Sequence, residues 1–334
     1  MESSQPQRKK FKTVQDWNDY IGPLVQSGQG ITGKDLFELR KACYQEIEEY
    51  RGRPLLVYAT KFLEGVPPNA PNFIDLSDID GFTDLINSVK NDGAVDVLLH
   101  SPGGRPDATE RLVGLLRGKF NEVNFLVPHS AYSAATMLAL SGNHIILHKS
   151  ATLGPIDPQI NGIPARSIKR GFEKVKERIA KEGPETLPAY IPLIEKYSLD
   201  LLELCEDSEK LSKELVSTWL KKYMLKDEKR IGRKIKKAVD YFSDYDKHLM
   251  HSRPLPLEKL TEFGLKIELA DEMLQELLWE AYILLNGFFN VSPFVKLYES
   301  THGVSWGKQF QQLFIGPQPQ QRIRPQQPQP QPQQ

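Results

Sequence analysis

The sequence predicts an α/β fold up to about residue 160, followed by a mostly helical C-terminal extension. Short apolar runs alternate with amphipathic segments, which is typical of parallel strands joined by right-handed helical crossovers. Of the 334 residues, 40% are hydrophobic and 26% are charged, a composition that can build a substantial globular core. From Ala165 to Leu249 the sequence becomes helical in pattern and heavily charged, which marks the extension.

The first elements can be assigned in chain order. Residues 1–30 are polar and weakly patterned, so we expect a flexible N-terminal segment whose basic stretch RKKFK is a solvated tail. Thr32 and Asp35 then form a capping-box pattern at the start of a helix that extends to about Tyr50. Apolar runs predict strands within residues 53–60, 95–101, 123–130 and 144–154. The segments between them predict helices within residues 78–93, 105–120 and 133–142.

These elements divide the chain into five parts, of which residues 1–30 are the first. Residues 31–164 form the α/β core, and residues 165–250 form the charged helical region. Residues 251–315 complete the domain with a short strand in EFGLKIE and a closing helix in LADEMLQELLWEAYILLNGFF. Residues 316–334 are a Pro/Gln tract without the apolar residues that a core needs, so we expect them to be disordered.

The charge balance and the cysteine count argue against several classes of protein. Lysine plus arginine equals aspartate plus glutamate at 43 each, so the net charge is zero and a nucleic-acid binder is not expected. The two cysteines, Cys43 and Cys205, suggest by their spacing neither a disulfide nor a metal site, which fits a reducing compartment. No apolar run is long enough to span a bilayer. We therefore expect a soluble, cytoplasmic protein.

The first chemical motif is LLHSPGG at residues 98–104, where an apolar strand runs into Pro-Gly-Gly before a helix. Two glycines leave backbone N–H groups unobstructed at the carboxyl end of a parallel strand, which is where ligands bind in such sheets. A plain strand-to-helix turn with positive φ explains the two glycines equally well. No Gly-Lys-Ser/Thr follows, so the motif does not support a phosphate-binding loop.

The second motif is PHSAYSAATMLALSGN at residues 128–143, which also follows an apolar strand and opens a helix. If the two strands are neighbours in the sheet, the two glycines of the first motif face Ser133 and Ala134. Ser133 is then a hydroxyl nucleophile beside backbone donors for a developing oxyanion. The alternative is close helix packing through small residues, with Ser130 as the N-cap, and the spacing alone favours it.

Three motifs in order, LLHSPGG, SAYSAATMLAL and SATLGPIDPQ, resemble the motif set of the Clp/crotonase-fold serine peptidases. Within this fold the chain is most similar to the serine dehydrogenase proteinases, a signal-peptide-peptidase-A-like group. The resemblance covers residues 55–159 and returns more weakly at HSRPLPLEKLTEFGLKIE. It implies a crotonase/Clp-protease-like fold of stacked ββα units with a helical C-terminal extension. It also implies peptide-bond hydrolysis without a metal or nucleotide cofactor.

The resemblance assigns roles to individual residues. Ser133 matches the nucleophile, and Gly104 and Ala134 match the two donors of the oxyanion hole, with Gly103 shaping the turn. Asp157 matches a position typical of the subgroup, where it would orient the catalytic lysine or line the substrate groove. A cap on the turn before a proline is the alternative for this aspartate, and we favour that interpretation.

The resemblance identifies the general base less directly than it identifies the nucleophile. At the triad histidine of Clp proteases this chain has Pro155 or Ile156, so the resemblance implies the Ser-Lys dyad of membrane-associated relatives. The lysine then comes from residues 161–183 and lies on the buried side of its helix, because desolvation lowers the pKa of an ammonium group toward neutrality. Lys169, which is 36 residues after the serine, aligns best, and Lys174 is the alternative. Otherwise these lysines form the solvent-facing side of a charged helix.

The expected function is therefore that of a serine peptidase that acts on a peptide or protein substrate. By analogy with such folds, which bury helical faces between copies, we also expect a homo-oligomer. Peripheral membrane association stays an open alternative. Two other functions stay open as well, namely a CoA-thioester enzyme with the same oxyanion-hole architecture and a catalytically inactive scaffold or assembly protein.

Overall fold

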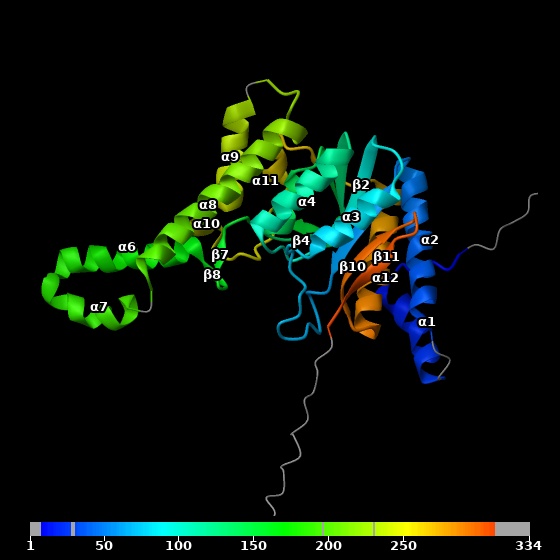
Figure 1. Ribbon diagram of the computed structural model, residues 1–334, viewed down its shortest axis with the longest axis horizontal. Helices are drawn as coiled ribbons and strands as arrows, with labels where there is room; N and C mark the ends of the chain where they lie inside the picture. The colour runs from blue at the N-terminus through cyan, green and yellow to red at the C-terminus, as the bar shows by residue number, and fades with distance from the viewer. Residues whose placement is uncertain (1–7, 28–30, 196, 230, 311–334) are drawn as a thin grey trace, which may run out of the picture.

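The computed structural model describes residues 8–27, 31–195, 197–229 and 231–310 (Figure 1). Seven strands form the central sheet: β1 Leu55–Thr60, β2 Ala94–His100, β3 Glu122–Val127, β5 His144–Leu147, β9 Ile267–Leu269, β10 Phe294–Ser300 and β11 Ser305–Gln309. Their order across the sheet is β11-β10-β1-β2-β3-β5-β9. The five strands from β1 to β9 are parallel, whereas β10 and β11 are antiparallel to their neighbours. The predicted α/β fold is confirmed.

Helices cover both faces of the sheet and enclose two cores. One core is closed by α1 Val14–Gln26, α2 Gly33–Arg51 and α12 Glu272–Val291. The other is closed mainly by α3 Asp78–Ser88, α4 Pro106–Lys119 and α5 Ala134–Leu140. Alternate strand residues supply the two cores, so Val57 lies in the first core while Leu56 and Tyr58 lie in the second. Burial on both faces explains why these strands are mostly apolar, with Asp96 in β2 and Asn124 in β3 as buried exceptions.

Three strands of the large sheet continue into a second, smaller layer. β2 is followed by Ser101, β3 by β4 (Ser130–Ala131), and β5 by β6 (Thr152–Leu153). Ser101 forms a parallel bridge with Ala131, and β4 pairs in parallel with β6. Each unit therefore gives one strand to the large sheet and one to the small layer before its helix begins. The expected stacked ββα organisation is confirmed.

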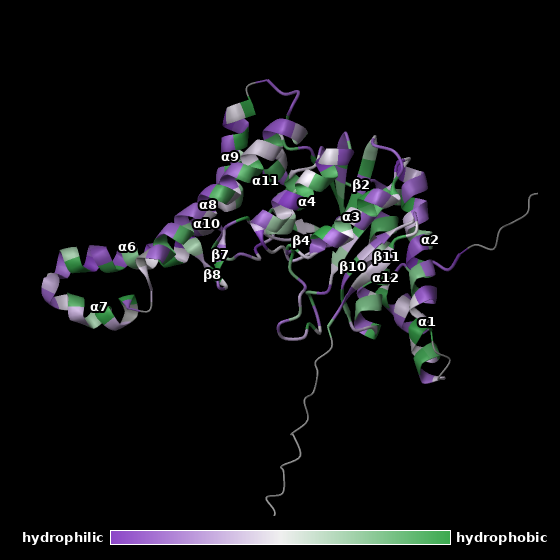
Figure 2. Ribbon diagram, viewed as in Figure 1, coloured by the Kyte–Doolittle hydropathy of each residue, from purple (hydrophilic) through white to green (hydrophobic). Residues whose placement is uncertain are grey.

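The charged helical region contains a projecting arm. A hairpin of β7 (Gln159–Ile160) and β8 (Ile163–Pro164) leads into α6 (Ala165–Glu182), a 3-10 turn (Pro184–Thr186) and α7 (Leu187–Ile194). Figure 1 shows α6 and α7 extending away from the sheet, and Figure 2 shows hydrophilic and hydrophobic residues alternating along α6. The chain then returns to the second core through α8 Leu199–Trp219, a π-helical turn Leu220–Met224, α9 Ile231–Ser243, α10 Tyr245–His248 and α11 Leu257–Glu262.

The N-terminal segment, which we expected to be flexible, contains an ordered helix. Thr13 and Asp16 form a capping box at the start of α1, and Trp17 is buried against Gly287 of α12. Within the basic stretch, the Arg8 guanidinium is 2.7 Å from the Glu280 carboxylate, and Phe11 is buried. Tertiary packing on α12 therefore stabilises a segment whose own apolar pattern is weak. Residues 1–7 and 28–30 lie outside the described residues.

The C-terminal part contains both predicted elements and two strands that the pattern did not predict. β9 and α12 occupy the positions expected for the short strand and the closing helix. β10 was not predicted because Lys296 and Glu299 interrupt its apolar pattern. Both side chains are nevertheless fully buried, each beside a partner of opposite charge. The Pro/Gln tract at residues 316–334, which we predicted to be disordered, lies outside the described residues.

Candidate active site

The carboxyl ends of β2 and β3 lie side by side, because the two strands are parallel neighbours. Backbone hydrogen bonds continue this pairing beyond the strands. Ser101 N donates to Ser130 O at 3.1 Å, and Tyr132 N donates to Ser101 O at 3.1 Å. The Pro-Gly-Gly turn after Ser101 and the turn that opens α5 therefore meet at one edge of the sheet.

Gly103 packs directly against the turn that carries Ser133. A Cβ atom on Gly103 would lie 2.8 Å from Ser133 Cβ and 2.7 Å from Ala134 N. Its φ of +93° is also in the region that favours glycine. The Gly103 N–H donates to Ser101 Oγ at 3.2 Å, so this amide is bound within its own turn. The structure thus brings Gly103, Ser133 and Ala134 together.

Gly104 lies against Ile74, in the segment before α3. The two residues form a parallel bridge, in which Ile74 N donates to Gly103 O at 2.7 Å and Arg105 N donates to Ile74 O at 2.9 Å. The N–H of Gly104 and the carbonyl of Gly103 belong to one planar trans peptide, so they point in opposite directions. The Gly104 N–H therefore points away from Ile74, and it donates to no acceptor within the described chain.

Ser133 has a backbone conformation that residues with side chains rarely adopt. Its φ is 52° and its ψ is −123°, immediately before the first turn of α5. Such strain costs about 1–3 kcal/mol and persists where the surrounding structure imposes it. The side chain is partly exposed and makes no capping hydrogen bond. The Ala134 N–H also has no acceptor among the described residues, so a hydroxyl and two amide donors are available in adjacent turns.

The alternative for the small-residue run, close packing with Ser130 as the N-cap, is only partly matched. Ala134 and Ala135 are buried in the second core, as close packing requires. Ser130, however, lies in β4, and its hydroxyl is 2.7 Å from His129 Nδ1. The N-cap position of α5 belongs to Ser133 instead.

The histidines nearest these turns are held in the neutral form. Burial and, to a smaller extent, the neighbouring His129 lower the pKa of His100, at the end of β2, to about 3. Burial also lowers the pKa of His129, whose ring stacks on Tyr282 with the ring centroids 4.4 Å apart. These rings pack against α12. Their contacts give them a structural role beside the site.

The two lysines proposed from the sequence lie on the projecting helix α6. The Lys169 ammonium is 3.1 Å from the Glu209 carboxylate and 3.8 Å from the Glu206 carboxylate, both on α8. Lys174 is exposed to solvent. Neither lysine forms a hydrogen bond with Ser133 in the part of the chain that the structure describes.

Asp157 is paired with His251, which the sequence did not identify as a candidate site residue. The aspartate side chain is buried, and its Oδ1 lies 2.9 Å from His251 Nδ1 while its Oδ2 accepts from Gln159 at 3.0 Å. An ionised carboxylate can only accept hydrogen bonds, so beside it His251 Nδ1 is the donor of this contact. Asp157 thus bonds to two side chains, which differs from the turn cap that we favoured.

The Asp157–His251 pair lies beside the small layer that leads to Ser133. Leu255 N donates to Leu153 O at 3.0 Å, which ties the segment after His251 to β6. β6 in turn pairs with β4, whose last residue is two positions before Ser133. The resemblance placed the base among the lysines of residues 161–183. The one signal that could have revealed His251 was the C-terminal segment HSRPLPLE, in which it is the first residue.

The residues that the structure describes contain neither a metal-binding cluster nor a membrane-spanning helix. No three His, Cys, Asp or Glu side chains are grouped so that they could hold a metal ion. In the same residues, no helix combines the length and the apolar character required to cross a membrane.

The sequence matches one family and two curated proteins. The family model of ClpP-like SDH-type serine proteinases matches residues 30–283. An uncharacterized protein of Methanocaldococcus jannaschii is 28% identical over 234 residues, which cover 68% of this chain and 71% of that protein. A second uncharacterized protein of the same organism is 34% identical over 112 residues, which cover 34% of this chain and 38% of that protein.

Two proteases are among the solved structures that match this chain. The ClpP protease catalytic domain from Plasmodium falciparum has 9% identity and a TM-score of 0.32, over 60% of this chain and 82% of that chain. A membrane-bound stomatin-specific protease in complex with a substrate peptide has 17% identity and a TM-score of 0.36, over 61% of this chain and 73% of that chain.

Proposed function

We propose that this chain, which belongs to the family of ClpP-like SDH-type serine proteinases, hydrolyses peptide bonds with Ser133 as its nucleophile. Ser133 Oγ attacks the scissile carbonyl carbon while a general base takes its proton. The N–H groups of Gly104 and Ala134 stabilise the oxyanion that forms. The protonated base then donates to the leaving amine, and water hydrolyses the acyl-serine by the same steps in a second half-reaction.

The contact between Gly103 and Ser133 carries this proposal. A side chain at position 103 would push the two turns apart, because its Cβ would lie 2.4 Å from Tyr132 O. With glycine there, the hydroxyl and the Gly104 amide can act on one substrate carbonyl. A single donor of an oxyanion hole contributes about 3 kcal/mol to catalysis, so such an approach of the two turns has a large effect on rate.

Two kinds of group are candidates for the general base. The family resemblance favours a Ser-Lys dyad with Lys169, or alternatively Lys174, and this requires Lys169 to leave its ion pair with Glu209. The contact with Asp157 favours His251, because a buried carboxylate on Nδ1 fixes the tautomer whose Nε2 takes a proton, as in serine-protease triads. We propose His251 as the base on this contact, with Asp157 as the residue that orients it.

A catalytically inactive scaffold of the same fold is the second candidate function. The observation that favours it is the ion pair between Lys169 and Glu209, which leaves a Ser-Lys dyad unassembled in the single chain. A scaffold would keep the Ser133 turn for packing and would not react with an electrophile. The labelling experiment below separates the two functions.

We further propose that the protein acts on peptides or proteins in the cytoplasm as a homo-oligomer. The support for an oligomer is the projecting arm, which exposes apolar side chains that a second copy would cover. They are Ile163, Leu187, Ile191 and Tyr197. Sedimentation of the purified chain tests this part of the proposal, and a monomer at micromolar concentration contradicts it.

The test of the function is labelling by a fluorophosphonate, which reacts with activated serine hydroxyls. We expect the label on Ser133, located by peptide mapping, and no label on the Ser133→Ala variant with an unchanged circular-dichroism spectrum. Ser150→Ala is the matched control, because Ser150 is an exposed serine in a turn of the same core, and it should label like the natural chain. Absence of label on the folded natural chain supports the scaffold instead.

A further inference from the structure

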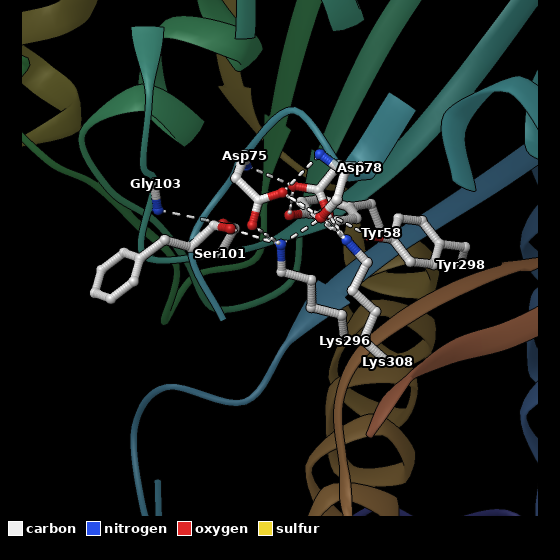
Figure 3. A network of polar contacts seen from close by, with 10 residues as sticks. Tyr58, Asp75, Asp78, Ser101, Gly103, Lys296, Tyr298 and Lys308 are labelled. Atoms are coloured by element: carbon white, nitrogen blue, oxygen red, sulfur yellow. Dashed lines mark hydrogen bonds and ion pairs between the residues drawn. The ribbon is translucent and has the colours of Figure 1, made fainter. Parts of the chain in front are cut away.

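One face of β10 carries a buried ion pair near the turn that contains Gly103 (Figure 3). Lys296 and Asp78 are both fully buried, and Lys296 Nζ lies 2.7 Å from Asp78 Oδ1. The same ammonium donates to the carbonyl of Phe73 at 2.6 Å and lies 3.3 Å from the Asp75 carboxylate. One lysine therefore binds three groups on or next to the segment that precedes α3.

Asp78 is the centre of this cluster. Tyr58 donates a hydrogen bond to its Oδ2 at 3.1 Å, and Tyr298 donates to its Oδ1. Burial and the Asp78 carboxylate raise the pKa of both tyrosines, so both remain protonated donors. The Asp75 N–H also donates to Asp78, at 2.8 Å. Asp78 is thus held in a fixed position by partners from β1, β10 and its own segment.

Stability alone does not explain such a cluster. Removing an ammonium and a carboxylate from water costs several kcal/mol per group, and a well-packed hydrophobic pair is often as stable as a buried ion pair. What an ion pair adds is a defined geometry for the groups around it. The question is therefore which group near Lys296 and Asp78 needs a defined position.

Ile74 is that group. Its neighbours on both sides are bound by the cluster, because the Phe73 carbonyl accepts from Lys296 and the Asp75 N–H donates to Asp78. Ile74 itself uses its N–H and its carbonyl for the Gly103 carbonyl and the Arg105 N–H. The bond to the Gly103 carbonyl sets the orientation of the Gly103–Gly104 peptide plane. In a planar peptide, this also sets the direction of the Gly104 N–H.

We propose that Lys296 and Asp78 are positioning residues of the oxyanion hole: they hold the Phe73–Asp75 segment, which orients the Gly104 N–H through Ile74. This inference rests on the proposed function for the role of Gly104. Without the ammonium, the Phe73 carbonyl loses its donor, and Lys308 of β11, 3.5 Å from Asp78, remains as the neighbouring cation. The segment then loosens, and the peptide between the two glycines can rotate away from the productive orientation.

The first test compares Lys296→Met with Arg40→Met. Arg40 on α2 also forms a fully buried ion pair with β10, through Glu299, but on the other side of the sheet from the cluster. Both variants lose a buried cation beside a buried carboxylate that keeps other hydrogen-bond donors, which are Tyr58 and Tyr298 for Asp78 and Tyr44 for Glu299. We expect kcat for a peptide substrate to fall about 100-fold in Lys296→Met, with KM within about twofold. In Arg40→Met, kcat should change less than about threefold.

A second readout does not depend on activity. Hydrogen–deuterium exchange, followed by mass spectrometry, should show about tenfold faster exchange in peptides that contain the Ile74 and Arg105 amides of Lys296→Met. The peptide that covers β3 should be unchanged, and Arg40→Met should show no effect at Ile74. If Lys296→Met does not fold, Asp78→Asn, which preserves size but replaces one acceptor oxygen and the negative charge, takes its place with the same expectations.

The outcomes separate the inference from the function on which it rests. Equal exchange at Ile74 in Lys296→Met and Arg40→Met overturns the inference, as does an equal loss of kcat in both. If the natural chain neither labels nor hydrolyses, the proposed function fails. The exchange comparison then still decides whether the ion pair holds Ile74.

Discussion

Gly103 lies so close to Ser133 that a methyl group on the glycine would lie 2.8 Å from the serine Cβ. Real Cβ atoms do not approach each other to this distance, so the absence of a side chain sets the separation of the two turns. The backbone of Gly103 also has a positive φ of 93°, which an L side chain disfavours. Both properties can be tested by adding one methyl group.

We predict that Gly103→Ala loses most of its reactivity and much of its stability. The new methyl would overlap Tyr132 O and Ala134 N, and the positive φ adds backbone strain. The free energy of unfolding should fall by about 2 kcal/mol or more. Urea unfolding and the rate of fluorophosphonate labelling measure the two effects.

Gly114→Ala is the control for this prediction. Gly114 is an exposed residue within α4, and a Cβ there would meet no atom within 4 Å. Alanine in a helix interior stabilises by up to about 1 kcal/mol relative to glycine, so this variant should be slightly more stable and fully reactive. Equal behaviour of the two alanine variants would show that the Gly103 contact is unimportant.

A second prediction concerns the strained backbone of Ser133. Glycine tolerates its φ of 52°, whereas alanine retains the strain. Both replacements remove the hydroxyl and should abolish labelling. Ser133→Gly should nevertheless unfold at a higher urea concentration than Ser133→Ala, with a difference of about 1 kcal/mol in free energy of unfolding. If Ser133→Gly is the less stable variant, the strain is not present in the folded protein.

A third prediction identifies the general base. A general base contributes about 10²-fold to 10⁴-fold in rate, so His251→Ala should label at least about 100-fold more slowly than the natural chain. Free imidazole should restore part of the rate, since it can fill the space of the missing ring. Lys169→Met should label at the natural rate. The opposite pattern, with a slow Lys169→Met and a normal His251→Ala, would assign the base to the lysine.

A fourth prediction concerns stability in acid. Burial lowers the pKa of His100 in the fold from 6.5 to about 3, so the folded chain keeps this ring neutral while the unfolded chain takes up a proton. The free energy of unfolding therefore falls as the pH falls below about 6.5. From this group alone, the loss between pH 7 and pH 5 is about 2 kcal/mol.

His100→Phe tests the acid prediction, because it removes the titrating group and retains an aromatic ring next to Phe62. Its free energy of unfolding should vary less between pH 7 and pH 5 than that of the natural chain. Urea unfolding at both pH values provides the measurement. An unchanged difference would mean that His100 takes up a proton in the fold without penalty.

Much of the fold could be predicted from local pattern. The strands β1, β2, β3 and β5 are rich in apolar residues, and the capping box of Thr32 and Asp35 marks the start of α2. The helix α1 was not predicted, although Thr13 and Asp16 form a similar capping box, because the burial of Trp17 depends on tertiary contacts that include Gly287 of α12. β10 was missed for a related reason: a charged residue is assigned to the surface unless its partner is known.

In the candidate site, too, local motifs could be predicted from the sequence, whereas long-range contacts could not. The glycine turn and Ser133 are both local motifs at strand ends, so their meeting follows from the parallel pairing of β2 and β3. Asp157 and His251 are separated by 94 positions, and no spacing rule connects them. The contact of Lys169 with α8 depends in the same way on how two helices pack, which the sequence does not reveal.

Because β10 follows the catalytic motifs in the chain, it is made after them during translation. A nascent chain that has emerged only as far as α12 already contains the glycine turn, the serine and Asp78, but it still lacks the cation at position 296. On our assignment, such a chain cannot yet cut its neighbours on the ribosome. On this assignment, proteolytic competence arises only after β10 has been made and docks beside β1.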